Sequence, residues 1–201
     1  MENVTDRESN PFGMNPPCKT HAVPGYGDAN ADFHVIGDNP QLHGGVETGV
    51  PFTGSEAGER IQSVLHETGF VDSEYSDAPN YENVFTNYIH ACADEPTRES
   101  YARLERYFDA ELRAINAHIL LPVGKRTTRH ALAEYTTQLR KLEDSSMEDL
   151  HATEIRGRGF LVIPVSEPAD WDGEGDALVQ KLKEVLMSDY RQTKGVATRI
   201  G

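Results

Sequence analysis

A glycine-rich loop that follows a short apolar run carries the side chains best suited to chemistry in this chain. The apolar run is 33–36, and the loop from Gly37 to Gly58 reads GDNPQLHGGVETGVPFTGSEAG. A strand that runs into such a loop, with a helix start at Ser55, places backbone N–H groups and small polar side chains at the carboxyl end of a sheet. Ligands bind at that edge in α/β folds. We therefore expect the functional site here.

Asp38 and Asn39 are the first polar residues of this loop. A carboxylate or amide aimed at a water molecule can orient it and act as a general base. Asp-Asn-Pro is equally good turn chemistry. The two side chains are therefore expected either to orient a reacting water or to hold the loop. His43 and Glu47 lie close by and are weaker candidates for the same water.

Apolar runs alternate with helical patterns along the rest of the chain. The expected strands are 32–37, 83–89, 118–123 and 160–165, and the expected helices are 55–68, 97–116, 126–135 and 175–190. Short apolar strands separated by helices predict a three-layer α/β fold, with a four-stranded parallel sheet between helices. Residues 136–158 lack a steady period and are expected to form a variable connection or a short helix.

Three segments follow from this pattern. Residues 1–31 are rich in Asn, Pro, Gly and Asp and are expected to form an irregular arm. Residues 32–194 are expected to form the folded domain, and 195–201 a flexible tail. A chain of 201 residues with 37% hydrophobic content fits one soluble domain.

Neither a membrane span nor a signal peptide is visible, because no apolar run approaches 18 residues. Two cysteines are too few for a disulfide framework and suit a reducing compartment. We therefore expect a cytoplasmic protein, and a monomer.

The charge balance is unusual. Thirty-three acidic residues against 19 basic ones give a net charge of -14, and only six of the basic residues are lysines. Affinity for DNA normally rests on Lys and Arg, so this composition favours a protein that never meets DNA. A spread acidic surface with Arg preferred over Lys also resembles proteins of salt-accumulating organisms, in which salt would screen the repulsion from DNA.

Four motifs, in order, resemble those of the uracil-DNA glycosylase superfamily, especially its thermostable four-cysteine branch. They are the loop after 33–36 with its G-x-x-P and G-x-P-F-x-G steps, VFTNYIHACADEPTRE, HILLPVGKRTTRHAL and FLVIPVSEPADW. The resemblance implies a four-stranded parallel sheet between helices, in agreement with the strand pattern. It also implies DNA as partner, and an enzyme that flips a damaged base out of the duplex and hydrolyses its glycosidic bond.

The resemblance assigns roles to individual residues. Phe52 matches the ring that stacks on the base, and Asn87 matches the amide that reads the base edge. Gly37 and Pro40 complete the base-binding turn. Asp38 and Asn39 match positions where different branches carry the group that orients the water. The alternatives are a core aromatic for Phe52 and a loop-fixing amide for Asn87.

The last motif departs from the family. Glu167 stands where active branches have a histidine that donates to the departing base. An ionised carboxylate there would repel the base anion. Trp171 lies near the residue that wedges into the base stack, and it is assigned to DNA contact together with Ser166. Packing at the start of the last helix is an equally good interpretation of Trp171.

The cysteine pattern also departs from the four-cysteine branch. Cys18 and Cys92 match two iron-sulfur ligands, but Leu104 replaces another, so we expect the cluster to be lost and no cofactor to be bound. A zinc site from Cys18, His21, His90 and Cys92 is the less favoured alternative. Two cysteines left as small core residues is the favoured one.

Two functions remain open. One is a glycosylase of uracil or another deaminated base, with Asp38, Asn39, Phe52, Asn87 and Glu167 in its pocket. The other is a catalytically silent protein of the same fold that binds a nucleic acid or a partner.

Overall fold

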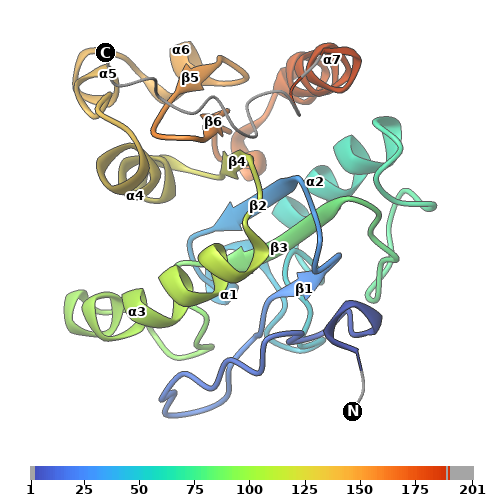
Figure 1. Cartoon of the computed structure of the whole chain (residues 1–201), viewed down its shortest axis with the longest axis vertical. Helices are drawn as coiled ribbons and strands as arrows, with labels where there is room; N and C mark the ends of the chain where they lie inside the picture. Colours follow the sequence, from blue (N-terminus) through green and yellow to red (C-terminus); the bar gives the residue numbers. More distant parts are fainter. Residues whose placement is uncertain (1–2, 189, 191–201) are drawn as a thin grey trace, which may run out of the picture.

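A six-stranded sheet in the order β1-β3-β2-β4-β6-β5 forms the middle layer of the computed structural model, which describes residues 3–188 and 190 (Figure 1). Strands β3, β2, β4 and β6 pair in parallel, as the sequence predicts, and β1 and β5 add an antiparallel strand at each edge. The strands are β1 (Tyr26–Gly27), β2 (Phe33–Gly37), β3 (Val84–Tyr88), β4 (Ile119–Pro122), β5 (Ile155–Arg156) and β6 (Leu161–Val162).

The four long helices lie close to their expected ranges, and two of their starts carry side-chain caps. Ser55 accepts a hydrogen bond from the N–H of Gly58 (3.1 Å), and Thr97 forms a capping box with Ser100. The helices are α1 (Pro40–His43), α2 (Glu56–Glu67), α3 (Arg98–Ile115), α4 (Lys125–Tyr135), α5 (Arg140–Asp144), α6 (Met147–Leu150) and α7 (Glu174–Met187), with 3₁₀ turns η1 (Val4–Asp6) and η2 (Pro168–Asp170). The expected tail, 195–201, lies outside the described residues.

Helices cover both faces of the sheet (Figure 1). Phe33 and Val35 of β2 belong to the apolar cluster that includes α2 and α7, whereas Ile36 belongs to the cluster that includes α3 and α4. Successive side chains of a strand point to opposite faces, so one face of the sheet packs on α2 and α7 and the other on α3 and α4.

The carboxyl ends of the parallel strands meet along one edge, and their loops are tied to one another. The N–H of Ile89 donates to the carbonyl of Gly37 (3.0 Å), and the N–H of Gly124 donates to the carbonyl of Val165 (2.8 Å). The loops after β2, β3, β4 and β6 are therefore held side by side, and they carry every motif identified in the sequence.

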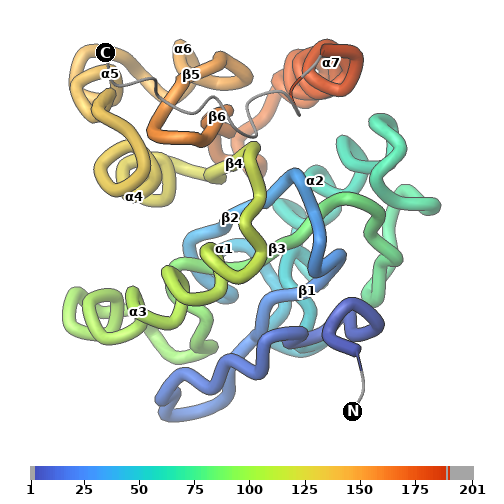
Figure 2. Tube along the Cα trace, in the orientation of Figure 1, coloured from blue at the N-terminus to red at the C-terminus, as the bar shows by residue number. Residues whose placement is uncertain are grey.

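The arm, the blue segment in Figure 2, lies at the β1 edge. Within the arm, η1 and β1 are the regular elements of the described residues, and a bridge joins Ser9 to Tyr26. No helix in the described part of the chain is both long and apolar enough to cross a bilayer.

Candidate functional site

Asp38 lies at the end of β2 in a cluster of three side chains. Its carboxylate accepts a hydrogen bond from the Tyr101 hydroxyl and lies 3.2 Å from Nε of Arg126. The Arg126 guanidinium also stacks 4.5 Å above the Tyr101 ring. Burial, reinforced by the bond to Asp38, raises the pKa of Tyr101, so its phenol stays protonated and donates. The Asp38 side chain keeps 11% exposure and remains within reach of a water molecule.

Asn39, unlike Asp38, uses its side chain to cap a helix. Its side-chain oxygen accepts the N–H of Leu42 (3.1 Å), which makes Asn39 the N-cap of α1. Pro40 follows at the first helical position, where its missing N–H costs nothing. Asn39 and Pro40 therefore shape the turn, and of the residues Asp38–Pro40 it is Asp38 whose carboxylate lies at the edge of the sheet.

Glu167 and His43 form a pair that links the first motif to the last. Nε2 of His43 lies 3.1 Å from the Glu167 carboxylate, and the backbone N–H of Asp38 donates to Nδ1 of the same ring (3.0 Å). Since Nδ1 accepts, this network places the His43 proton on Nε2, where it is donated to Glu167. His43 is fully buried, and the Glu167 side chain is 25% exposed.

The turn after β4 accommodates this pair. Gly124 has φ +82°, and a Cβ there would lie 3.0 Å from a Glu167 oxygen. The sequence offers His43 only as a weaker candidate for orienting the water. Its position in the glycine-rich loop was the signal that could have pointed to a further role at this site.

Phe52 is fully buried, and other rings cover it. The His43 ring stacks on it at 5.6 Å with an interplanar angle of 19°, and the Tyr88 ring lies at 5.4 Å. The N–H of Phe52 donates to the Tyr88 hydroxyl (2.8 Å). A base that stacks on Phe52 must therefore displace His43 or Tyr88.

Asn87 lies on the opposite face of the sheet from Phe52. Its amide oxygen accepts from Nε2 of His34 (2.9 Å), and its amide nitrogen donates to Glu111 of α3 (2.8 Å). Tyr88, the next residue of β3, points the other way and contacts Phe52. The structure thus does not bring Asn87 and Phe52 together, and Tyr88 holds the position beside Phe52.

The network around Asn87 is buried and contains two perturbed groups. Burial raises the pKa of Glu111 to about 7, against the opposing effect of the Asn87 hydrogen bond. Burial lowers the pKa of His34 to about 4. His34 is therefore neutral at physiological pH, and the network ties β2, β3 and α3 together.

Ser166 and Trp171 anchor the loop that carries Glu167. The indole Nε1 of Trp171 donates to Oγ of Ser166 (2.9 Å), and the N–H of Ser166 donates to Nδ1 of His151 (3.0 Å). Arg60 holds the Trp171 carbonyl at 2.7 Å. A pocket opens beside this loop and beside Glu167, and its lining includes Lys125, Met147, Ser166, Glu167, Asp170 and Trp171.

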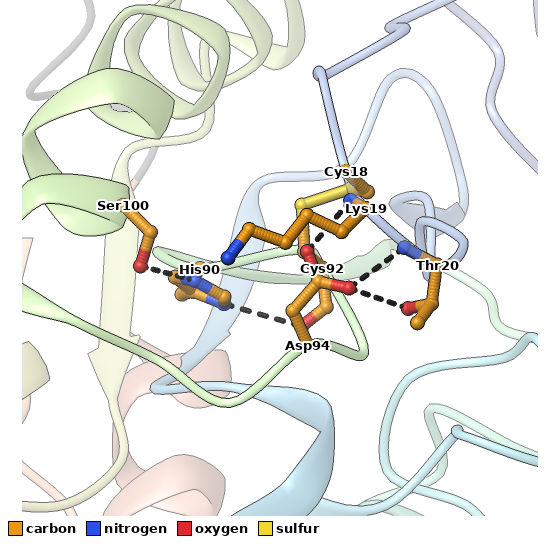
Figure 3. The surroundings of a disulfide bond; sticks show 7 residues. All are labelled: Cys18, Lys19, Thr20, His90, Cys92, Asp94 and Ser100. Carbon is orange, nitrogen blue, oxygen red and sulfur yellow. Dashed lines mark hydrogen bonds between the residues drawn. A yellow bond between two sulfur atoms is a disulfide. The ribbon is translucent and has the colours of Figure 1, made fainter.

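The cysteines differ from the expectation of two free core thiols. Cys18 and Cys92 form a disulfide, with their Cα atoms 5.3 Å apart, that joins the arm to the segment after β3 (Figure 3). Beside it, the carboxylate of Asp94 accepts the N–H groups of Lys19 and Thr20, both at 2.7 Å. Free thiols were expected because two cysteines are too few for a disulfide framework and suit a reducing compartment; the disulfide between residues 74 positions apart contradicts that expectation.

The disulfide also removes the thiolates that the proposed zinc site needs. His90 is hydrogen-bonded to Ser100 (2.8 Å), and Nε2 of His21 lies 3.0 Å from the carbonyl of Val46. Over residues 3–188 and 190, no group of three or more His, Cys, Asp or Glu side chains is arranged to hold a metal ion. The four residues considered for zinc are therefore not arranged as a tetrahedral site.

Comparison with known proteins supports the same family. The chain is 29% identical to a type-5 uracil-DNA glycosylase of Thermus thermophilus over 126 residues, which is 59% of this chain and 58% of that protein. It is 29% identical to a type-5 enzyme of Pyrobaculum aerophilum over 82% of this chain and 73% of that protein. It is 23% identical to a type-4 enzyme of Saccharolobus solfataricus over 88% of this chain and 76% of that protein. The family model of the uracil DNA glycosylase superfamily matches residues 24–181, and the chain therefore belongs to that superfamily.

Proposed function

We propose that this protein acts on DNA as a base-excision glycosylase, and that uracil or another deaminated base is its substrate. The observation that carries the proposal is the convergence of Asp38, His43 and Glu167 at the carboxyl edge of the sheet. The relatives described above are named as uracil-DNA glycosylases, and this supports the same reaction class here.

In the proposed reaction the bond between C1′ of the sugar and the base nitrogen breaks, and its electron pair leaves with the base. A water oxygen forms the new bond to C1′, and the water proton passes to the Asp38 carboxylate. Tyr101 and Arg126 each use one carboxylate oxygen, but each oxygen has a second lone-pair site for the water. The role of Asp38 is to orient the water and accept its proton.

The departing base needs a hydrogen-bond donor, and we assign this role to the Nε2–H of His43. In the free protein the Nε2–H of His43 donates a hydrogen bond to the Glu167 carboxylate. A carboxylate so close to the leaving group opposes the negative charge that develops on the base. We therefore expect slow excision, with His43 rather than Glu167 contacting the base.

A catalytically silent protein that binds nucleic acid is the second candidate. Two observations favour it: Phe52 is fully buried beneath His43 and Tyr88, and Asn87 faces α3. The two candidates differ in whether any base is released.

The test is base release from duplex and single-stranded DNA that carries uracil, hypoxanthine or xanthine, at salt concentrations from low to molar. Native protein is compared with Asp38→Asn and with Asp72→Asn, which changes an exposed carboxylate between α2 and β3. Release that only Asp38→Asn abolishes supports the glycosylase. No release from any substrate, with DNA binding retained, supports the silent protein.

A further inference from the structure

The space beside Gly37 is filled by two rings of the chain itself. A Cβ on Gly37 would lie 2.5 Å from the Tyr88 ring and 2.8 Å from Nδ1 of His43. Only a glycine allows both rings to sit directly against this backbone. Tyr88 is 1% exposed and His43 is fully buried. The turn at Gly37, which the family resemblance assigns to base binding, is therefore already in close contact with the rings of Tyr88 and His43.

The polar atoms of these rings also complete the hydrogen bonds of the surrounding loop. The Tyr88 hydroxyl accepts the N–H of Phe52 (2.8 Å) and donates to the carbonyl of Gly44 (2.9 Å). Burial raises the pKa of Tyr88, so the phenol stays neutral and keeps its proton. The Tyr88 hydroxyl therefore acts as the acceptor for one buried N–H and as the donor to one buried carbonyl.

A uracil ring offers the same combination. It is a flat six-membered ring in which a carbonyl oxygen, an acceptor, adjoins an N–H donor. With Tyr88 absent, that carbonyl could accept the N–H of Phe52, and the adjacent N–H could donate to the carbonyl of Gly44. Both backbone groups are buried, so leaving either without a partner would be costly.

We propose that Tyr88 occupies the base site in the free protein, and that the site beneath it takes a pyrimidine with an adjacent carbonyl and N–H. The proposal deepens the glycosylase function and rests on it for the class of ligand. Tyr88 decides whether a base fits on Phe52, and the free protein does not bind a free base.

The test measures binding of small ring compounds to Tyr88→Ala by equilibrium dialysis and NMR. Phenol reports that the cavity is open, as small aromatic ligands enter engineered cavities. Uracil is the probe, and 1,3-dimethyluracil is its control because it lacks N–H donors. We expect Tyr88→Ala to bind phenol and uracil, with uracil bound about tenfold or more tightly than 1,3-dimethyluracil. Native protein and Tyr88→Phe should bind none of them.

Tyr81→Ala is the matched control. Tyr81 is a buried tyrosine of the same apolar cluster, and its hydroxyl has no hydrogen-bond partner among the described residues. A cavity there should admit phenol but show no preference for uracil. Should Tyr88→Ala fail to fold, Tyr88→Val, which has no polar side-chain atom, serves in its place, with uracil expected to raise its melting temperature and not that of native protein.

Equal uracil binding by native protein and the Tyr88 variant would overturn the proposal. So would a Tyr88 variant that binds phenol but not uracil, because the space would then be an ordinary core cavity. These readouts need no DNA cleavage. If uracil binds to Tyr88→Ala while native protein releases no base from DNA, only the proposed function fails.

Discussion

Nε2 of His43 lies 3.1 Å from the carboxylate of Glu167, and this contact joins the loop after β2 to the loop after β6. The glutamate that departs from the family motif is therefore a partner of a buried histidine. The departure at Glu167 and the position of His43 belong together: a carboxylate at 167 gives the Nε2 proton of His43 an acceptor.

Removing this acceptor should destabilise the protein. Glu167→Ala leaves the buried Nε2–H of His43 without a partner, so we expect the free energy of unfolding to fall by about 1–3 kcal/mol. Glu167→Gln keeps an acceptor and should cost less. Urea denaturation measures both, with the exposed Asp170→Ala as control. Native-like stability of Glu167→Ala would show that the pair does not hold the two loops.

Stability should depend on pH through Glu111. Its folded pKa of about 7 lies above the ordinary value of 4.5, so its contribution is fully present below pH 4.5 and is lost as pH rises through 7. Glu111→Gln removes this loss. We expect Glu111→Gln to gain up to about 3 kcal/mol relative to native protein between pH 4.5 and pH 8, at about 1.4 kcal/mol per pKa unit.

The comparison between the two proteins isolates Glu111. His34, with a pKa lowered to about 4, acts in the opposite sense: its contribution is present above pH 6.5 and is lost as pH falls through 4. It is common to both proteins and largely cancels in the difference. Urea unfolding at several pH values provides the measurement, and a difference that stays constant with pH would mean that Glu111 titrates normally.

Reduction of the disulfide should loosen the arm and lower stability. The bond spans 74 residues, and for a loop of that length the chain-entropy account gives about 4 kcal/mol. We expect native protein to unfold at lower urea concentration when a reductant is present. The double variant Cys18→Ser/Cys92→Ser should unfold at the same lower urea concentration without reductant, and reductant should not change that concentration. A reductant effect of equal size on both proteins would contradict this assignment.

Cations at the start of α4 are expected to bind DNA phosphates. Lys125 and Arg129 are exposed next to the Gly124 turn, in a chain whose net charge is -14. Lys125→Gln/Arg129→Gln should weaken DNA binding and lower the slope of log affinity against log salt by about 1 for each phosphate that is no longer neutralised. Lys141→Gln/Lys183→Gln makes the same charge change on α5 and α7 and should bind like native protein. If both double variants weaken DNA binding equally, the effect comes from the net charge and not from the position of Lys125 and Arg129.

The parallel strands and long helices could be predicted because their signals are local. Ser55 and Thr97 cap helices directly after turns, and β2, β3 and β4 are short apolar runs. The edge strands β1 and β5 were missed because each has only two residues, too few for any periodicity to show.

The direction of a strand side chain was harder to predict. Every residue of β3 is buried, so the hydrophobic pattern does not show which face Asn87 occupies. A shift of one residue exchanges the two faces, and this places Tyr88 rather than Asn87 beside Phe52. Asp38, by contrast, lies at the sheet edge as the loop predicted, because its position depends only on where β2 ends.

The most direct test of the proposed function is the rate of uracil release from a duplex under single-turnover conditions, with native protein and Asp38→Asn in excess over DNA. The proposed mechanism predicts release by native protein and a rate about 10²–10⁴ lower for Asp38→Asn, because the water loses its general base. Equal rates for the two proteins, or no release by native protein at any salt concentration, would contradict it.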